Sequence, residues 1–231
     1  MEFAAVLFDM DGVVVDTMPL HRTVWRRFAA ARGIHRTEEE LRPLDGRRAT
    51  DIIALLFDEQ DPVRAAELAE AREALYREML MGASLRAIPG AEAYLARLRA
   101  RGVPRILATS ATLENVDQVL GPLGLRAAFD GVVTAADVAR GKPAPDVYHR
   151  AAALAGVPPN RCLVVEDAVP GIEAARAAGS LCLGLATSLA PEALLAAGAR
   201  WVAPDLQALA AGQAPWERDP GACPQSQEDN P

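Results

Sequence analysis

The sequence predicts an α/β protein built on a doubly wound parallel sheet with an inserted α-helical cap. Short apolar runs recur along the chain with helical patterns between them, and this alternation is typical of α/β folds. The runs are continuously apolar, as expected of strands buried on both faces of a parallel sheet. A long, largely helical stretch separates the first run from the second. The 231 residues, at about 150 per domain, suit one large domain or one domain with an insert.

Six strands are predicted, each from one apolar run. They are Ala4–Phe8, Arg105–Ala108, Gly131–Thr134, Cys162–Val165, Leu181–Leu185 and Trp201–Ala203. The helices predicted between them include Ala91–Arg101, Leu113–Leu120, Pro145–Ala155 and Gly171–Ala178. Each of these helices is followed by a glycine of the kind that ends helices: Gly102, Gly124, Gly156 and Gly179. Right-handed crossovers would join the strands into one sheet.

The helical cap is predicted at residues 17–84, directly after the first strand. Two apolar stripes at helical spacing support it. The first stripe is Leu20, Val24, Phe28 and Ala31, and the second is Val63, Ala66, Leu75, Met79 and Leu80. Residues 1–16 and 85–211 would then form the Rossmann-like core. Residues 212–231 are rich in Pro, Gln, Asp and Glu and have little to bury, so we expect disorder there.

Composition excludes several classes of partner. The formal net charge of −7 argues against nucleic acid, whose phosphates select basic surfaces, and against an anionic membrane. No apolar run approaches the roughly 18 residues of a spanning helix, and we find no signal peptide. The three cysteines show no metal-binding spacing, and their odd number does not make a disulfide framework. We expect a monomer in the reducing cytoplasm.

Two aspartates follow the first predicted strand, where open α/β sheets bind ligands. Asp9 and Asp11 are two residues apart, and if both face one site their like charges require a cation. A simple acidic turn around Gly12 also explains the pattern. This motif alone therefore leaves the choice between a reactive pair and a structural turn open.

A second acidic pair, Glu166 and Asp167, follows the fourth predicted strand. In a parallel sheet these side chains emerge at the same edge as Asp9. Several unpaired carboxylates buried together would cost several kcal/mol each, and Mg²⁺, which prefers carboxylate, water and phosphate oxygens, resolves this cost. The alternative is an acid pair that faces the dipole of the following helix.

Two further motifs could hold a phosphate. Lys142, the single lysine of the chain, stands before a helix that begins with proline, and its ammonium could neutralise a phosphate and a carboxylate together. Thr109 and Ser110 follow the second predicted strand, where hydroxyl and backbone N–H groups can bind phosphate. The alternatives are a solvated loop lysine and an ordinary helix N-cap.

In this order the motifs resemble those of the haloacid dehalogenase superfamily of phosphohydrolases, over residues 3–205. Asp9 and Asp11 resemble its first motif, Thr109 the second, Lys142 the third, and the Glu166–Asp167 pair the fourth. The helical insert lies where the first-type cap of this superfamily enters. Residues 14–21 and 166–175 are similar to the β-phosphoglucomutase and sugar-phosphatase branch.

The resemblance implies a mechanism. Asp9 would attack phosphorus and form an aspartyl-phosphate. Asp11 would protonate the leaving alcohol and then deprotonate the attacking water. Mg²⁺ would be held by Asp9, Asp167 and the backbone carbonyl of Asp11, with Glu166 nearby or linked through water. Thr109 and Lys142 would stabilise the phosphoryl oxygens.

The resemblance also names candidates for substrate binding. Thr17 and His21 fit the mutase pattern, in which a histidine near the cap hinge helps to position the general acid, although His21 also suits an ordinary polar position on the first cap helix. Arg72 is either a substrate contact or a solvated helix charge. The remaining candidates are the cap-loop residues and a neighbour of Thr109: Gly46, Arg47, Arg48 and Ser110.

The sequence favours a phosphatase over a phosphomutase. Ala49 stands where β-phosphoglucomutase has the arginine that grips the second phosphate, and Ala111 and Leu113 replace its phosphate-binding serine and asparagine. We therefore expect a Mg²⁺-dependent phosphatase of a small sugar or polyol phosphate, with a phosphomutase as the alternative. A non-catalytic phosphate-binding module is a distant third, because such a module would be expected to lose the nucleophile, the acid/base or the lysine.

Overall fold

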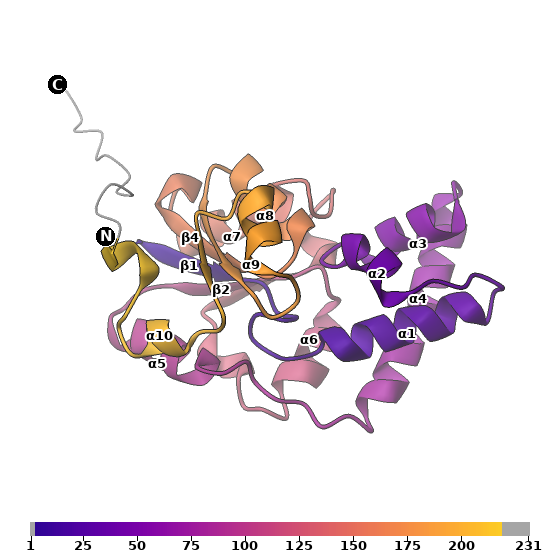
Figure 1. Ribbon diagram of the computed structural model, residues 1–231, viewed down its shortest axis with the longest axis horizontal. Coiled ribbons are helices and arrows are strands. Elements are labelled where there is room, and N and C mark those ends of the chain that lie inside the picture. Colours follow the sequence, from indigo (N-terminus) through magenta and orange to yellow (C-terminus); the bar gives the residue numbers. More distant parts are fainter. Residues whose placement is uncertain (1–2, 219–231) are drawn as a thin grey trace.

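A computed structural model of the protein describes residues 3–218. It contains a sheet-based core and a helical cap, which lie side by side in Figure 1. All the strands pair in parallel, in the order β3-β2-β1-β4-β5-β6. They are β1 (Ala5–Phe8), β2 (Arg105–Ala108), β3 (Gly131–Val133), β4 (Cys162–Glu166), β5 (Leu181–Leu185) and β6 (Trp201–Ala203). The predicted fold class is confirmed.

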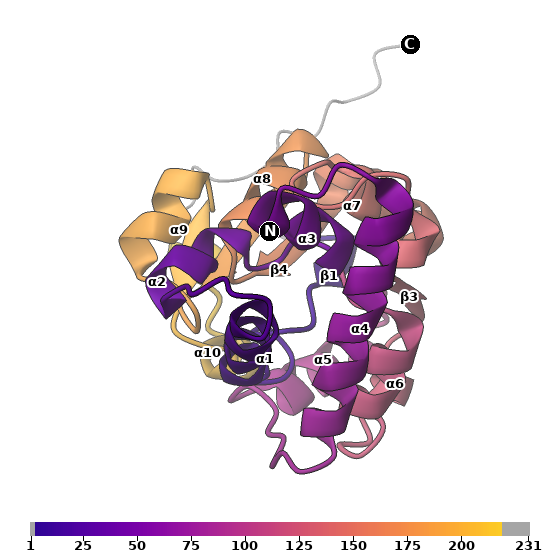
Figure 2. The same ribbon diagram turned by 90° about the vertical axis from the view of Figure 1, so that its right-hand side faces the viewer.

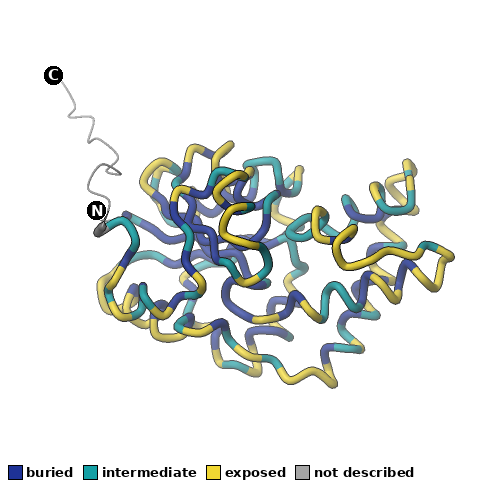
Figure 3. Tube along the Cα trace, viewed as in Figure 1, coloured by how far each residue is buried: buried dark blue, intermediate teal, exposed yellow. Residues whose placement is uncertain are grey.

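Helices cover both faces of the sheet, so the core has three layers. One face carries α5 (Ala91–Ala100), α6 (Leu113–Leu120) and α10 (Gln207–Ala210), and the other carries α7 (Asp146–Ala155), α8 (Val169–Ala177) and α9 (Pro191–Ala197). Successive strand residues serve the two layers in turn: Leu7 packs with the α7–α9 layer and Phe8 with the α5–α6 layer. Figure 3 shows the resulting continuous burial through the sheet.

The strand order brings two acidic motifs together. The chain builds the sheet outward from β1 through β2 to β3 and then returns to the other side of β1 with β4. Phe8 pairs with Val165, and the Asp9 N–H donates to the Val165 carbonyl at 3.0 Å. The residues that follow β1 and β4 therefore meet at the switch point of the sheet, which is where ligands bind in such folds.

The cap consists of α1 (Met18–Ala30), α2 (Glu38–Leu41), α3 (Ala49–Phe57) and α4 (Pro62–Leu80). It encloses a small apolar core of its own, centred on Trp25, Phe28 and Ile53. Figure 2, in which the cap faces the viewer, shows its helices in front of the ends of β1 and β4. The edge of the sheet at which the residues after β1 and β4 meet therefore lies beneath the cap.

The stripes predicted for the cap helices are partly wrong. Val24 and Phe28 are buried, but Ala31 is exposed. On α4 the error is larger, because Val63 and Ala66 face solvent. The buried face of α4 includes two charged residues: Ala65, Ala69, Arg72, Glu73, Tyr76 and Leu80. Leu80 is buried, and Leu75 and Met79 pack against the core, so the predicted stripe is correct for the second half of α4. In the first half the buried charges interrupt the hydrophobic period, and the pattern selected the wrong face.

Two neighbouring linkers connect the cap to the core. Val15 and Ala87 form an antiparallel bridge. The Asp16 N–H donates to the Arg86 carbonyl, and the Ile88 N–H donates to the Val14 carbonyl, each at 2.9 Å. The chain therefore leaves and re-enters the core at one point.

The end of the chain departs in part from expectation. Residues 215–218 form a short 3₁₀ helix, and Trp216 packs edge-on against Phe3 and Trp201 at centroid distances of 5.2 and 5.3 Å. The prediction of disorder from residue 212 is thus wrong for residues 212–218, because an aromatic side chain there finds apolar partners. Residues 219–231 lie outside the described residues. None of the helices in the described part of the chain is both long and apolar enough to cross a membrane.

Candidate active site

Lys142 lies at the centre of the site, almost completely buried. Its Nζ donates to Asp9 Oδ1 at 2.6 Å, to Glu166 Oε1 at 2.7 Å and to the Ala108 carbonyl at 3.2 Å. An ammonium has three hydrogens, so this set engages all of them. Burial disfavours the charge, but the Asp9 and Glu166 carboxylates outweigh burial and raise the pKa of Lys142. The lysine is therefore a fixed positive charge and not a solvated loop residue.

Glu166 orients that lysine. Its Oε1 also accepts from the Tyr148 hydroxyl at 2.6 Å, and its Oε2 accepts from the backbone N–H groups of Asp167 and Ala168 at 3.0 and 3.2 Å. Gly171 leaves room for it, since a Cβ there would come within 1.8 Å of Oε1. Both carboxylate oxygens of Glu166 thus accept hydrogen bonds from other groups of the protein.

Asp167 is held differently. Its side chain is buried, and Oδ2 has no hydrogen-bond partner among the described residues. Gly12 allows this position, because a Cβ on Gly12 would lie 2.0 Å from Asp167 Oδ2, and the φ of Gly12 is +75°. A buried carboxylate oxygen without a donor is costly, so this atom is suited to a cation.

The acidic cluster fits a hard divalent ion. Carboxylate oxygens of Asp9, Glu166 and Asp167 lie within 4.8 Å of one another. Burial, opposed by Lys142 but reinforced by Glu166 and Asp11, raises the pKa of Asp9 to about 7. Burial and the neighbouring carboxylates also raise the pKa of Asp167 well above its usual range. A bound Mg²⁺ would stabilise the ionised form of both buried carboxylates.

Asp11 lies beside this cluster in a contrasting environment. Its Oδ1 accepts from Thr17 Oγ1 at 2.5 Å and faces His21 Nε2 at 3.2 Å. Burial opposes ionisation of Asp11, but the hydrogen bonds from His21 and Thr17, together with the positive charge of Arg72, outweigh it and lower the pKa. The pKa values of the neighbouring Asp9 and Asp11 are thus shifted in opposite directions, so the two carboxylates have distinct electrostatic environments.

A buried polar chain extends from His21 into the cap. Arg72 Nη2 donates to His21 Nδ1 at 2.7 Å, and Arg72 Nη1 donates to Glu73 Oε1 at 2.8 Å. Glu73 Oε2 accepts from Asn115 Nδ2, on the core helix α6, at 2.5 Å. Arg72 is only 2% exposed, and its guanidinium carbon lies 4.6 Å from the Trp25 ring centroid. The alternative of a solvated helix charge for Arg72 is therefore wrong.

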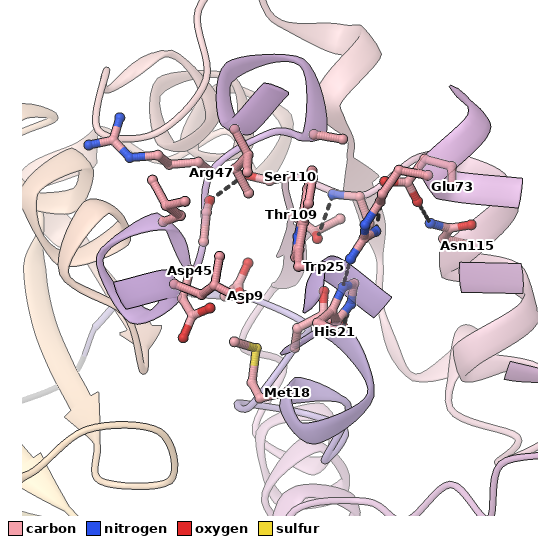
Figure 4. Close-up of a pocket in the computed structure, with 18 of the residues that line it drawn as sticks. Asp9, Met18, His21, Trp25, Asp45, Arg47, Glu73, Thr109, Ser110 and Asn115 are labelled. Carbon is pink, nitrogen blue, oxygen red and sulfur yellow. Dashed lines mark hydrogen bonds and ion pairs between the residues drawn. The ribbon is translucent and has the colours of Figure 1, made fainter. Parts of the chain in front are cut away.

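A cavity of about 70 Å³ separates the cap from the two aspartates. Figure 4 shows Asp9, His21, Thr109 and Glu73 around it. Since one water needs about 10–15 Å³ of such space, the cavity has room for a few waters. A sugar phosphate is larger than this space.

The other predicted residues occupy several places. Thr109, buried at the end of β2, accepts from the Ala111 N–H at 3.1 Å, and the Ser110 hydroxyl donates to the Gly46 carbonyl of the cap loop at 2.7 Å. Arg47 lines the cavity, although its side chain runs away from Asp9 in Figure 4. Arg48 instead donates to Asp51 at 2.9 Å and to the Ala139 carbonyl at 3.1 Å, away from the cavity.

A family comparison decides the assignment. Residues 3–179 match the family model described as "Hydrolase: haloacid dehalogenase-like hydrolase". The chain belongs to the haloacid dehalogenase-like hydrolases. The resemblance that the motifs suggested is thereby confirmed, as is an enzyme of the phosphoric monoester hydrolase class.

Relatives of this hydrolase include named phosphatases. It is 38% identical over 181 residues to fructose-1-phosphate phosphatase YqaB of Escherichia coli (strain K12), covering 77% of this chain and 93% of that one. It is 34% identical to hexitol phosphatase A of the same organism, covering 78% and 81%. A putative β-phosphoglucomutase from Bacteroides vulgatus has a similar structure, with a TM-score of 0.81, 27% identity and coverage of 97% and 91%.

Sequence reasoning missed three polar residues of this hydrolase site. Tyr148 donates a hydrogen bond to Glu166. In the sequence, the only indication of this role is that Tyr148 lies on the helix that follows Lys142. Glu73 and Asn115 form the contact between cap and core. Neither belongs to a motif, and each is polar within an otherwise amphipathic helix, so only the packing of α4 against α6 reveals them.

Proposed function

We propose that this hydrolase is a Mg²⁺-dependent phosphatase that removes phosphate from a small sugar or polyol phosphate through an aspartyl-phosphate on Asp9. The observation that carries the proposal is the buried cluster in which Asp9 meets Lys142 and Asp167 beside Asp11. A nucleophilic carboxylate, a fixed cation, a metal-binding carboxylate and a separately tuned acid/base are what phosphoryl transfer to a carboxylate needs.

Each side chain has a distinct role in the proposed reaction. Asp9 attacks phosphorus and forms the acyl phosphate while the alcohol leaves. Lys142 holds the Asp9 carboxylate in place and neutralises charge on the phosphoryl oxygens. Asp11, whose pKa is lowered in the metal-free protein, must be protonated in the substrate complex; it gives this proton to the leaving alcohol and then takes one from the water that hydrolyses the intermediate. Because Thr17 and His21 both face Asp11 Oδ1, we assign both proton transfers to Oδ2.

Asp9 and Asp167 are the side chains that we assign to Mg²⁺, with the backbone carbonyl of Asp11 and with Glu166 close by. When bound, the ion supplies positive charge to the phosphoryl oxygens. The unpartnered Oδ2 of Asp167 supports this assignment. Both oxygens of Glu166 already accept hydrogen bonds from the chain, which favours an indirect role for Glu166.

Arg72 supports hydrolysis over phosphate transfer within the substrate. A mutase must hold a second phosphate under the cap while the first is transferred. Arg72 is the buried cation of the cap, but its two Nη groups are engaged by His21 and Glu73, and the Glu73 carboxylate balances its charge. Ala49 stands where the mutase pattern has a cationic side chain, and Arg47, although it also lines the cavity, directs its side chain away from Asp9. A neutral sugar or polyol group suits this cavity better than a second phosphate.

The names of the relatives agree with this substrate class, since one is named for fructose 1-phosphate and another for hexitols. The individual substrate would be found with a phosphate-release screen over sugar, polyol and glycolate phosphates. The cytoplasmic location and the monomeric state expected from the sequence stay predictions.

An aryl phosphate tests the chemistry. With Mg²⁺ the wild type should release phosphate, and chelation by EDTA or the Asp9→Asn substitution should abolish release. Asp117→Asn, on the exposed side of α6 and paired with Arg126, is the matched control and should keep full activity. An Asp9→Asn variant that turns over normally would contradict the nucleophile assignment.

β-Glucose 1-phosphate separates the two subclasses. A phosphatase yields free phosphate in proportion to substrate consumed. Glucose 6-phosphate formed without free phosphate would instead establish the mutase alternative.

A further inference from the structure

We propose that Asn115 and Glu73 form a latch between core and cap, and that closing this latch sets His21, and through it Asp11, for proton transfer. The proposal rests on the proposed function, because it assigns positioning roles in the same reaction. Neither residue touches the reacting atoms in it. The latch is defined as the hydrogen bond from Asn115 Nδ2 to Glu73 Oε2.

The latch begins a continuous chain of hydrogen bonds. Asn115 holds one oxygen of Glu73 at 2.5 Å, and the other oxygen accepts from Arg72 Nη1 at 2.8 Å. Arg72 Nη2 reaches His21 Nδ1 at 2.7 Å, and His21 Nε2 reaches Asp11 Oδ1 at 3.2 Å. Figure 4 shows Asn115 facing Glu73 on one side of the cavity and His21 below them. Each link fixes the orientation of the next.

Arg72 determines where His21 carries its proton. A guanidinium can only donate hydrogen bonds, so His21 Nδ1 must accept. In neutral imidazole the hydrogen then lies on Nε2, the nitrogen that faces Asp11. Without Arg72 in this position the other tautomer becomes available, and it would turn a lone pair toward the Asp11 carboxylate. Stacking on Tyr76, at a centroid distance of 4.2 Å, holds the ring in plane.

The latch forms only when the cap is closed, because its two halves belong to different parts of the fold. Glu73 lies on α4 of the cap and Asn115 on α6 of the core, and both are buried. A buried carboxylate needs hydrogen bonds to be stable, and Asn115 supplies the donor to one oxygen of Glu73. Opening the cap would remove the Asn115 donor from Glu73 and loosen the carboxylate that orients Arg72. The acid/base would thus be set correctly when substrate is enclosed.

A second contact between the same two helices provides a control. Arg77 Nη1 of α4 lies 3.3 Å from Glu114 Oε2 of α6. The Glu114 side chain is 59% exposed. Among the described residues, no series of hydrogen bonds connects it to His21. Weakening this ion pair shows what the loss of an ordinary contact between cap and core does to activity. Weakening the latch shows what the loss of the hydrogen-bond series from Asn115 to Asp11 does.

The experiment exchanges the two halves of the latch. Asn115→Asp places two carboxylates against each other and should break it. The double variant Glu73→Gln with Asn115→Asp should restore it, because the glutamine oxygen can accept from Arg72 while its amide donates to the new aspartate. Glu114→Gln is the control. If Asn115→Asp fails to fold, Asn115→Ala, which removes the donor without adding charge, replaces it.

Two readouts are measured on each variant. In phosphate release from an alkyl phosphate with Mg²⁺, Asn115→Asp should lower kcat about tenfold or more, with little change in KM. The upper bound on this loss is the roughly 10²–10⁴-fold that a general acid contributes. The double variant should recover most of this loss, and Glu114→Gln should match the wild type. A loss that falls on KM alone, or a double variant no better than the single, would overturn the proposal.

The second readout needs no turnover. Long-range ¹H–¹⁵N spectra report histidine tautomers, and a His21→Gln variant identifies the His21 signals among the three histidines of the chain. The wild type should carry its proton on Nε2, Asn115→Asp should gain the other tautomer, and the double variant should regain the first. An unchanged tautomer in Asn115→Asp would overturn the latch. If the wild type releases no phosphate at all, the proposed function fails, and the spectra still decide the latch.

Discussion

Replacing Glu166 by glutamine distinguishes an anchor for Lys142 from a direct metal ligand. The two side chains have the same shape, but glutamine has one accepting oxygen where glutamate has two. Glu166 accepts four hydrogen bonds, two on each oxygen, from Lys142, Tyr148 and two backbone N–H groups. In either amide orientation two of these buried donors would face an NH₂ group.

The magnitude follows from those two donors. A buried donor left without an acceptor costs about 1–3 kcal/mol, so Glu166→Gln should lower the unfolding free energy of the metal-free protein by about 4 kcal/mol. If Glu166 served mainly as a metal ligand, the opposite sign would be expected without metal. Removing one of three crowded carboxylates would then relieve repulsion on Asp9 and Asp167, whose pKa values their neighbours raise.

Urea unfolding in EDTA measures the difference. Far-ultraviolet circular dichroism and tryptophan fluorescence should report coincident transitions, which tests two-state behaviour, and the midpoint should fall without a change in slope. Glu114→Gln, an exposed glutamate on α6, should stay within about 0.5 kcal/mol of the wild type. A Glu166→Gln variant as stable as the wild type, or more stable, would refute the anchoring role.

Further predictions concern the metal, pH and the end of the chain. Gly12→Ala should weaken Mg²⁺ activation sharply, because its Cβ would lie 2.0 Å from Asp167 Oδ2, whereas Gly102→Ala, also at positive φ but with open space around it, should leave activation unchanged. With its pKa raised to about 7, native Asp9 keeps a proton that the unfolded chain has lost. Its contribution to the stability of the metal-free protein should therefore fall as pH rises from about 4 to 7. Thermal melts in EDTA should show this fall in the wild type relative to Asp9→Asn, and excess Mg²⁺ should remove it. Trp216→Ala should cost about 1–3 kcal/mol in urea unfolding through lost aromatic contacts; an unchanged midpoint would mean that this packing contributes nothing.

The strands and the motifs that follow them could be predicted from sequence because both depend on local order. A continuously apolar run identifies a buried strand, and parallel pairing then brings the residues after β1 and β4 to one edge. The proximity of Asp9 and Asp167 follows from that topology. Carboxylate oxygens of Asp9, Glu166 and Asp167 lie within 4.8 Å of one another, which is within the range of a metal site.

The cap could be predicted only in outline. Hydrophobic periodicity located the helices, but it assigned Val63 and Ala66 to the buried face of α4, and both are exposed. The buried face instead carries Arg72 and Glu73, whose charges are tolerated because each satisfies the other. Such pairing depends on the neighbouring helices and leaves no periodic signal in the sequence. The polar chain to Asn115 was therefore beyond the reach of sequence patterns.

The paired linkers at Val15 and Ala87 have a consequence for engineering. Because the Asp16 N–H already donates to the Arg86 carbonyl, a short turn joining these two residues would excise the cap without displacing a core strand. The exposed remainder of the core cluster, where cap residues Val24 and Tyr76 now pack, would need polar replacements. The same junction would accept a cap grafted from another chain. The cap and the core are thus joined at a single junction, so one could be replaced while the other keeps its strands and helices.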